Sequence, residues 1–211
     1  MLMPTLVYFA ARGRAELIRI VLAEAGVDHA LEPVKELQPL KGTGRLPFDA
    51  VPVWEEPGGF RLAQSAAIAN HIARAHGLRG RSARDEALID QALGAVDDVR
   101  LELRKLVIAA PEQRAAVRAE LLSSTLPRWI GYFDRLLRQN RDGQGHLVGE
   151  AVSIADLALW YLLEMIQDNG FGAALQGSPL LPAFLARIGA RPKIAEYVRS
   201  PQRPPLVPLP G

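Results

Sequence analysis

The sequence has no cysteine among its 211 residues. This absence excludes disulfides, thiolate metal centres and a Cys-x-x-Cys redox pair, but it leaves open thiol chemistry on a sulfur atom that a ligand supplies. Histidine is scarce as well, with four residues scattered along the chain. His71 and His76 stand five residues apart, which is poor spacing for one face of a helix. We therefore predict no metal site.

Dense blocks of positive charge and long apolar runs are also missing. The formal net charge is +2, and the arginines are spread out without interleaved aromatic residues, so nucleic acid is not an expected partner. No apolar run approaches the roughly 20 residues that a membrane-spanning helix needs. The opening MLMPTLVYF lacks both a basic segment and a small-residue cleavage site. We expect no membrane partner, no signal peptide and a cytoplasmic location.

Residues 1–78 predict a small α/β domain. An apolar stripe at 15–25 indicates a helix, with Gly26 as its C-terminal stop. The polar connection at 35–49 is long enough to be a functional loop, and Pro57-Gly58-Gly59 separates two short β-like runs as in a hairpin. The expected order is strand 5–9, helix 15–25, a weaker strand 29–34, the connection, β-runs 50–56 and 59–63, and helix 65–75.

Strand signals vanish after a short charged linker at residues 79–83. The remainder, 84–211, predicts an all-helical domain that ends in an extended, proline-rich tail. We expect a kink at Pro127, because proline removes a backbone donor inside a helix. The fold class is thus α/β plus all-α. The predicted helices span residues 87–109, 113–139, 153–167, 181–188 and 193–199, and the third is apolar on nearly every side, which indicates burial.

Ser153 and Asp156 open the buried helix with the spacing of a capping box. In this arrangement the serine hydroxyl accepts from the amide three residues on, while the carboxylate reaches back to the serine amide. The pair is therefore expected to serve folding rather than chemistry.

Val51-Pro52 stands at the entry to a predicted strand. A proline there removes a ladder hydrogen bond, so it belongs at an edge or a special turn. We expect a cis peptide, which would present the neighbouring backbone to an extended peptide ligand. A trans edge proline is the alternative.

Gln64-Ser65 stands at the start of a predicted helix. Ser65 is a plausible N-cap, and that structural role is the simplest interpretation. Free amides and the positive end of the helix dipole also make this position a natural carboxylate site. Gln64 adds a donor and an acceptor for an amino-acid head group.

Tyr8 ends the first strand, just before the Arg12-Gly13-Arg14 turn. A tyrosine in this position is most often a core residue at an interface. Its alternative role is to donate a hydrogen bond to a developing thiolate, with Arg14 strengthening the positive field. Such a donor would lower the pKa of a ligand thiol, and each pKa unit corresponds to about 1.4 kcal/mol.

Five motifs, in order and with matching spacing across nearly the whole chain, resemble the cytosolic glutathione S-transferases, most closely the tyrosine-type sigma, pi and alpha classes. This resemblance implies a thioredoxin-like N-terminal domain followed by an all-helical domain. It also implies glutathione as co-substrate, no metal and a homodimer. The motifs are LVYFAARGRAELIR (6–19), LPFDAVPVW (46–54), FRLAQSAAIANHIA (60–73), GAVDDVR (94–100) and GEAVSIADLALW (149–160).

The resemblance gives Tyr8 and Arg14 the catalytic positions. Tyr8 matches the tyrosine whose hydroxyl stabilises the glutathione thiolate, and Arg14 matches the arginine that supports it. Val51, before Pro52, matches the residue whose backbone pairs with the cysteinyl part of glutathione.

The resemblance also assigns the γ-glutamyl end of glutathione. Gln64 and Ser65 match the pair that holds its carboxylate and amine. Asp98 matches an aspartate that reaches across a dimer interface towards that amine, and Asp97 is the alternative for this role. Without the resemblance, the two aspartates are a solvated patch on a helix.

Two departures from the family pattern stand out, one within the segment VKELQPLKGTGRLPF (34–48) and one at Ala50. Gln38 or Leu37 stands where these classes have a tryptophan, and either Lys41 or Arg45 could be the cation for the glycyl end of glutathione. Ala50 replaces a polar residue before the Val-Pro pair.

The acceptor pocket is expected between Tyr8–Ala10 and the helix around residues 101–108. Its predicted lining is Phe9, Ala10, Leu101, Arg104 and Ile108.

The sequence therefore predicts a glutathione transferase that conjugates small hydrophobic electrophiles. One alternative keeps the thiolate but makes the protein a glutathione-dependent isomerase or peroxidase. The other is a non-catalytic, ligandin-type binding protein, which Ala50 and the altered loop favour.

Overall fold

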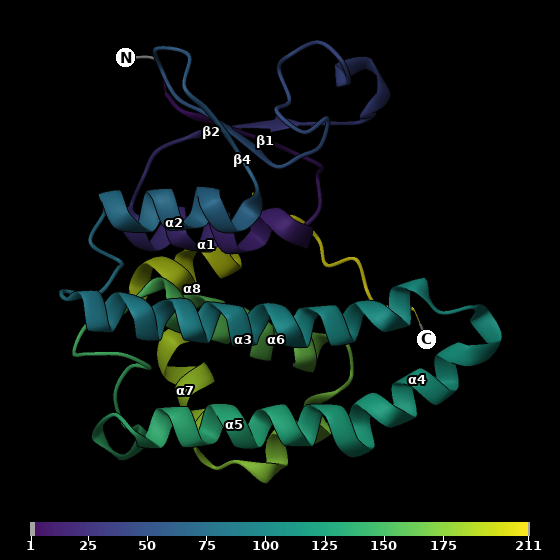
Figure 1. Cartoon of the computed structure of the whole chain (residues 1–211), viewed down its shortest axis with the longest axis vertical. Helices are drawn as coiled ribbons and strands as arrows, with labels where there is room; N and C mark the ends of the chain where they lie inside the picture. Colours follow the sequence, from purple (N-terminus) through teal and green to yellow (C-terminus); the bar gives the residue numbers. More distant parts are fainter. Residues whose placement is uncertain (1–2, 211) are drawn as a thin grey trace. The chain divides into compact units, whose positions relative to one another are not determined.

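The computed structural model describes residues 3–210, which fall into two compact units (Figure 1). The first unit contains residues 3–77 together with Pro192–Val207. The second contains Leu78–Arg191 together with residues 208–210. The first change of unit along the chain falls between Gly77 and Leu78.

The first unit is built on a four-stranded mixed sheet with the order β2-β1-β3-β4. The central β1 pairs in parallel with β2 and antiparallel with β3, and β3 and β4 form an antiparallel hairpin. All four predicted strands are present, each shorter than its pattern suggested. They span Thr5–Tyr8 (β1), Ala30–Pro33 (β2), Val53–Glu55 (β3) and Arg61–Ala63 (β4).

Helices α1 (Glu16–Ala25) and α2 (Ser65–Ala75) lie side by side against the sheet (Figure 1). A short 3-10 turn, Gly13–Ala15, precedes α1. The predicted stop at Gly26 is confirmed: this residue adopts a left-handed conformation, and its amide donates to the last helical carbonyls.

Helix α8 (Pro192–Arg199) packs against α1. The sequence assigns residues 193–199 to the all-helical domain, whereas the structure groups α8 with the first unit. The physical reason is a buried charge on α1. Glu16 is fully buried, and α8 brings Tyr197 to within hydrogen-bonding distance of it.

The opposite face of the sheet is covered by the connection between β2 and β3. Val7 and Val53 point to this face and pack with Leu46 in a small apolar cluster, against which Leu37 and Leu40 also pack. The connection contains a short 3-10 turn, Gln38–Leu40, so it is an ordered cover over the sheet.

The second unit is all-helical, as predicted. Helix α6 is its core, because eleven of its fifteen residues are buried, and it packs against α3 and α7. The α-helices of this unit span Ala83–Ile108 (α3), Arg114–Glu120 (α4), Leu126–Arg138 (α5), Ile154–Asp168 (α6) and Leu180–Gly189 (α7).

The predicted helix at 113–139 is interrupted by a π-helical segment, Leu121–Thr125, which ends two residues before Pro127. The residues at both ends of this segment keep helical dihedral angles, so the chain stays helical and the irregularity lies ahead of the proline, which has no amide hydrogen to donate.

The predicted capping box is confirmed at the start of α6. Asp156 is fully buried, and its Oδ2 accepts from the Ser153 amide at 2.8 Å, while its Oδ1 accepts from the Leu147 amide at 2.7 Å.

Two further observations hold for residues 3–210. No helix there is both long and apolar enough to cross a bilayer. No group of three or more histidine, aspartate or glutamate side chains is arranged to hold a metal ion.

Candidate active site

Strand pairing brings the predicted site residues of the first unit to one edge of the sheet. Val7 of β1 pairs with Val53 of β3, which pairs with Ala63 of β4. Since β1 and β4 both run antiparallel to β3, the carboxyl ends of β1 and β4 meet the amino end of β3. Tyr8, Pro52 and Gln64 are the next residues at these three ends, so the topology gathers them at one edge.

The Tyr8 hydroxyl accepts a hydrogen bond from the Arg14 main-chain amide at 2.9 Å. Because this bond occupies an acceptor position of the oxygen, the phenolic proton is left to donate to another group. From the sequence we expect Arg14 to act through its positive charge. The contact that the structure shows with the Tyr8 hydroxyl is made by the main-chain amide of Arg14.

Gly13 leaves room for this hydroxyl. It has a φ of +44°, and a Cβ placed on it would lie 2.6 Å from the Tyr8 oxygen. The turn therefore needs glycine both for its conformation and for its lack of a side chain.

Arg19 of α1 organises the same turn and is absent from the sequence prediction. Its side chain is 4% exposed, and its guanidinium donates to the carbonyls of Phe9 (3.4 Å), Ala11 (3.0 Å) and Arg12 (3.3 Å). It also lies 5.7 Å from the centre of the Tyr8 ring. A sequence signal exists, because Glu16 and Arg19, three residues apart, place opposite charges next to each other on α1.

Val51-Pro52 forms a cis peptide, as predicted. Pro52 is buried and Val51 is partly exposed, one residue outside the ladder that begins at Val53. Ala50 is exposed. The backbone of Val51 is thus close to the surface at the edge that carries Tyr8.

Gln64, and not Ser65, is the N-cap residue of α2; Ser65 is the first residue of the helix. Gln64 has φ 72° and ψ 116°, which is a strained conformation for a residue with a side chain. No side chain caps this helix end, and the first hydrogen bond runs from the Ile68 amide to the Gln64 carbonyl. The amides before Ile68 therefore point out of the helix end, where an anion can accept from them.

The two candidate cations of the connection have different surroundings. Lys41 is exposed. Arg45 donates four hydrogen bonds of 2.7 to 2.9 Å to Glu32 and Glu55. These bonds hold the pKa of both carboxyl groups below the usual range and raise the pKa of Arg45. Arg45 thus anchors the connection to β2 and β3.

A pocket of about 330 Å³ lies beside Tyr8 within the first unit. Phe9 and Ala10, both predicted to line the acceptor pocket, contribute to its wall. Leu6, Leu31 and Pro33 add an apolar surface from β1 and β2, and the segment Pro201–Pro205 forms the remaining side.

The predicted site residues of the second unit all lie on α3. Asp98, Leu101, Arg104 and Ile108 are exposed on this helix. Leu101 and Ile108 are large apolar side chains with exposed fractions of 57% and 70%. Their spacing places Leu101, Arg104 and Ile108 on one face of α3.

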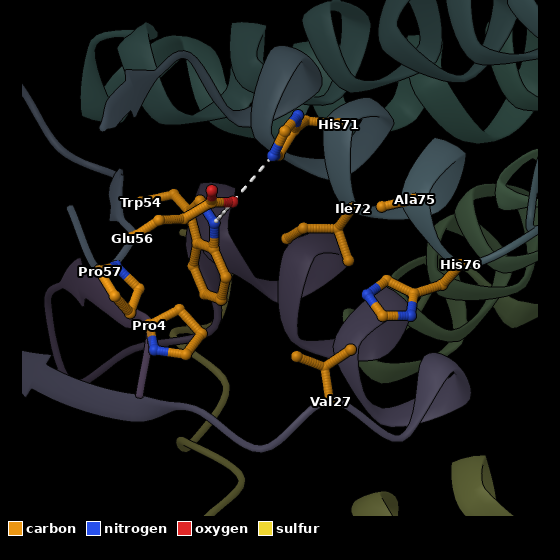
Figure 2. A pocket seen from close by; sticks show the side chains of 9 residues that line it. All are labelled: Pro4, Val27, Trp54, Glu56, Pro57, His71, Ile72, Ala75 and His76. Atoms are coloured by element: carbon orange, nitrogen blue, oxygen red, sulfur yellow. Dashed lines mark hydrogen bonds and ion pairs between the residues drawn. The ribbon is translucent and has the colours of Figure 1, made fainter. Parts of the chain in front are cut away.

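A second pocket of the first unit, of about 200 Å³, contains none of the predicted residues (Figure 2). Glu56 accepts hydrogen bonds of 2.8 Å from the indole of Trp54 and from His71. The indole bond is the main cause that lowers the pKa of Glu56. Glu56 follows β3 and Pro4 precedes β1, so this pocket lies at the other end of the sheet from Tyr8.

Both units match models of one protein family. Residues 4–74 match the "Glutathione S-transferase, N-terminal domain" and residues 97–201 match the "Glutathione S-transferase, C-terminal domain".

Similar proteins and solved structures belong to the same family as these two models. Rat glutathione S-transferase alpha-2 is 38% identical over 209 residues, covering 97% of this chain and 92% of that protein. Human glutathione S-transferase A1 is 33% identical, covering 96% of this chain and 92% of that protein. The structure of the Onchocerca volvulus pi-class glutathione S-transferase superimposes with a TM-score of 0.84 at 28% identity, covering 93% of this chain and 92% of that one. The chain therefore belongs to the glutathione S-transferase family, with its thioredoxin-like first unit and all-helical second unit.

Proposed function

We propose that this enzyme binds glutathione in its first unit and activates the glutathione thiol with the Tyr8 hydroxyl. The observation that carries the proposal is the geometry of that hydroxyl. It accepts from the Arg14 amide at 2.9 Å, so its own proton is available to a sulfur atom. The same edge of the sheet carries a cis Val51-Pro52 peptide and the uncapped end of α2.

The proposal assigns a partner to each part of glutathione. The γ-glutamyl carboxylate binds the amides at the start of α2, with the Gln64 side chain and the Ser65 hydroxyl as further partners. The backbone of Val51 pairs with the cysteinyl residue. Lys41 binds the glycyl carboxylate, because the donors of Arg45 are occupied by Glu32 and Glu55.

Tyr8 lowers the pKa of the bound thiol by donating a hydrogen bond to its charged form. A cysteine-type thiol starts near a pKa of about 8.5, and a donor in a positive environment can bring it below neutrality. The thiol proton goes to solvent. The thiolate then attacks a carbon of the electrophile, and a carbon–sulfur bond forms as a leaving group departs or as the adduct takes up a proton. Tyr8 thus supplies thiolate activation, and binding supplies proximity.

The acceptor is a small hydrophobic electrophile. The apolar pocket next to Tyr8, Phe9 and Ala10 supports this class. We also propose a cytoplasmic homodimer in which Asp98 of a second copy faces the γ-glutamyl amine.

Calorimetry with glutathione and ultraviolet titration of the bound thiolate test this function. Glutathione should bind, and Tyr8→Phe should raise the pKa of the bound thiol by roughly 1–2 units and slow conjugation of a reactive aryl halide about 100-fold at neutral pH. Tyr132→Phe, a change of a surface tyrosine in the second unit, is the matched control and should leave both values unchanged.

Two outcomes would contradict this proposed function. An unshifted thiol pKa in the wild-type complex would exclude the tyrosine mechanism. No binding at millimolar glutathione would favour the ligandin-type alternative, which has support from one observation: Arg45, one of the two candidate cations, is already paired.

A further inference from the structure

A buried charge cluster joins the chain segment after α8 to the start of α1. Glu16 of α1 is fully buried, and its Oε1 accepts from Arg203 Nε at 2.8 Å. Its Oε2 accepts from the Tyr197 hydroxyl at 3.0 Å and from Arg19 Nη1 at 3.3 Å. The Arg203 side chain is only 5% exposed, so this ion pair is withdrawn from solvent.

The cluster contacts the turn that holds Tyr8. Arg19 donates to the carbonyls of Phe9, Ala11 and Arg12, which are three of the four residues between Tyr8 and Gly13. A second link runs directly from the tail, because Arg12 Nε donates to the Pro204 carbonyl at 3.1 Å. The turn at residues 9–13 is therefore held by hydrogen bonds both from Arg19 of α1 and to Pro204 in the segment after α8.

The charges of the cluster do not cancel. Arg19 and Arg203 carry two positive charges against the single negative charge of Glu16. Tyr197 stays a neutral donor, because burial and the Glu16 carboxylate both raise its pKa. The excess positive charge lies next to the Tyr8 ring, from whose centre the Arg19 guanidinium is 5.7 Å away.

We propose that Arg203 is a positioning residue for Tyr8. By pairing with Glu16 it fixes Arg19, and Arg19 in turn fixes the three carbonyls of the turn that presents the Tyr8 hydroxyl. The inference rests on the proposed role of Tyr8 and adds to it a requirement for residue 203, far from the reacting atoms in the sequence.

Arg203→Gln tests the proposal through the pH profile of kcat/KM. The variant should lose about 10-fold in kcat/KM near pH 6.5, because a displaced hydroxyl lowers the thiol pKa less, and the loss should shrink as the pH rises above the thiol pKa of both proteins. The KM for glutathione should change less than twofold. Arg203→Lys, which keeps the charge and a donor, should recover most of the activity.

Two further variants separate positioning from stability. Tyr197→Phe removes one donor to Glu16 while keeping the ring, and should shift the pH profile in the same direction by less. Lys193→Met is the matched control, because Lys193 also joins α8 to α1, by a 3.1 Å bond to the Glu24 carbonyl at the far end of α1. It should leave the profile unchanged.

A double-mutant cycle that combines Arg203→Gln with Tyr8→Phe tests whether Arg203 acts through Tyr8. In the Tyr8→Phe background, Arg203→Gln should have little further effect on kcat/KM. An equal loss in both backgrounds, or a loss that is the same at every pH, would overturn the positioning role. This outcome differs from failure of the proposed function, in which Tyr8→Phe itself leaves the thiol pKa and the activity of the otherwise wild-type protein unchanged.

Discussion

Gly13 and Tyr8 fit together with no space for a side chain between them. The site where a Cβ of residue 13 would stand is 2.6 Å from the Tyr8 oxygen and 3.3 Å from the nearest ring carbon. A side chain at residue 13 would therefore compete with the hydroxyl for the position next to the Arg14 amide.

Gly13→Ala should displace the Tyr8 hydroxyl and lower kcat/KM for an aryl halide by about 10–100-fold at neutral pH. Gly77→Ala is the control, because Gly77 also has a positive φ (+71°) but no atom within 4 Å of the added Cβ. Both changes should cost roughly 1–2 kcal/mol of unfolding free energy for the left-handed backbone. Equal activity of the two variants would contradict the steric explanation.

Lys41→Met should weaken glutathione binding about 10-fold, since it removes one charge-assisted contact to the glycyl carboxylate. The kcat at saturating glutathione should stay within about twofold, because the contact is remote from sulfur. Lys35→Met, which removes another exposed lysine of the same connection, is the control for net charge. Isothermal titration of the three proteins gives the comparison, and matching affinities would rule out the role of Lys41.

Arg45→Gln should lower the unfolding free energy by roughly 1–2 kcal/mol at pH 7, a discounted value because Glu32 is 44% exposed. The pKa values of Glu32 and Glu55 are depressed in the folded protein. Their stabilisation is thus present above the ordinary value of 4.5 and is lost as the pH falls through the folded-state values.

The measurement for Arg45 is urea unfolding of wild type and variant at pH 7 and near pH 3. The difference between them should shrink at the lower pH. Arg61→Gln removes a weaker partner of Glu55, at 3.2 Å and 46% exposed, and should cost less. A difference that is independent of pH would refute the ionic origin.

Asp156→Asn should destabilise the protein by about 2–4 kcal/mol, because an amide nitrogen would replace an oxygen that accepts from buried donors. Ser153→Ala should cost less, about 1 kcal/mol, since it removes the hydroxyl that accepts from the Asp156 amide and donates to Asp156 Oδ2 at 3.0 Å but leaves the carboxylate in place. Thermal unfolding measures both. Activity per folded molecule should be unchanged, and a specific loss of activity would place this pair in the site instead.

Local chemistry made much of the fold predictable. The φ of +70° at Gly26, the capping box of Ser153 with Asp156 and the cis peptide before Pro52 each depend on residues close together in the sequence. Helix α2 begins and ends where its apolar spacing indicated, at Ser65 and Ala75.

Features that depend on distant pairings were not predictable. Arg45 meets Glu32 and Glu55 only because β1 pairs with both β2 and β3. The strained φ of Gln64, which makes it the N-cap in place of Ser65, arises where β4 turns directly into α2. Arg19 differs, because its partners are local: its pairing with Glu16 is visible in the sequence, whereas its contacts with three carbonyls depend on the shape of the preceding turn.

The ion pair between Glu16 and Arg203 spans 187 residues of sequence, and this separation has a consequence for biosynthesis. A chain emerging from the ribosome presents α1 long before residue 203 has been added. Until then Glu16 has only Arg19, three residues along the same helix, as a cationic partner within the cluster, and its burial would be costly. The first helix of a nascent chain should therefore stay exposed to solvent or to a chaperone, and the turn that follows Tyr8 should reach its final form only after residue 203 has left the ribosome.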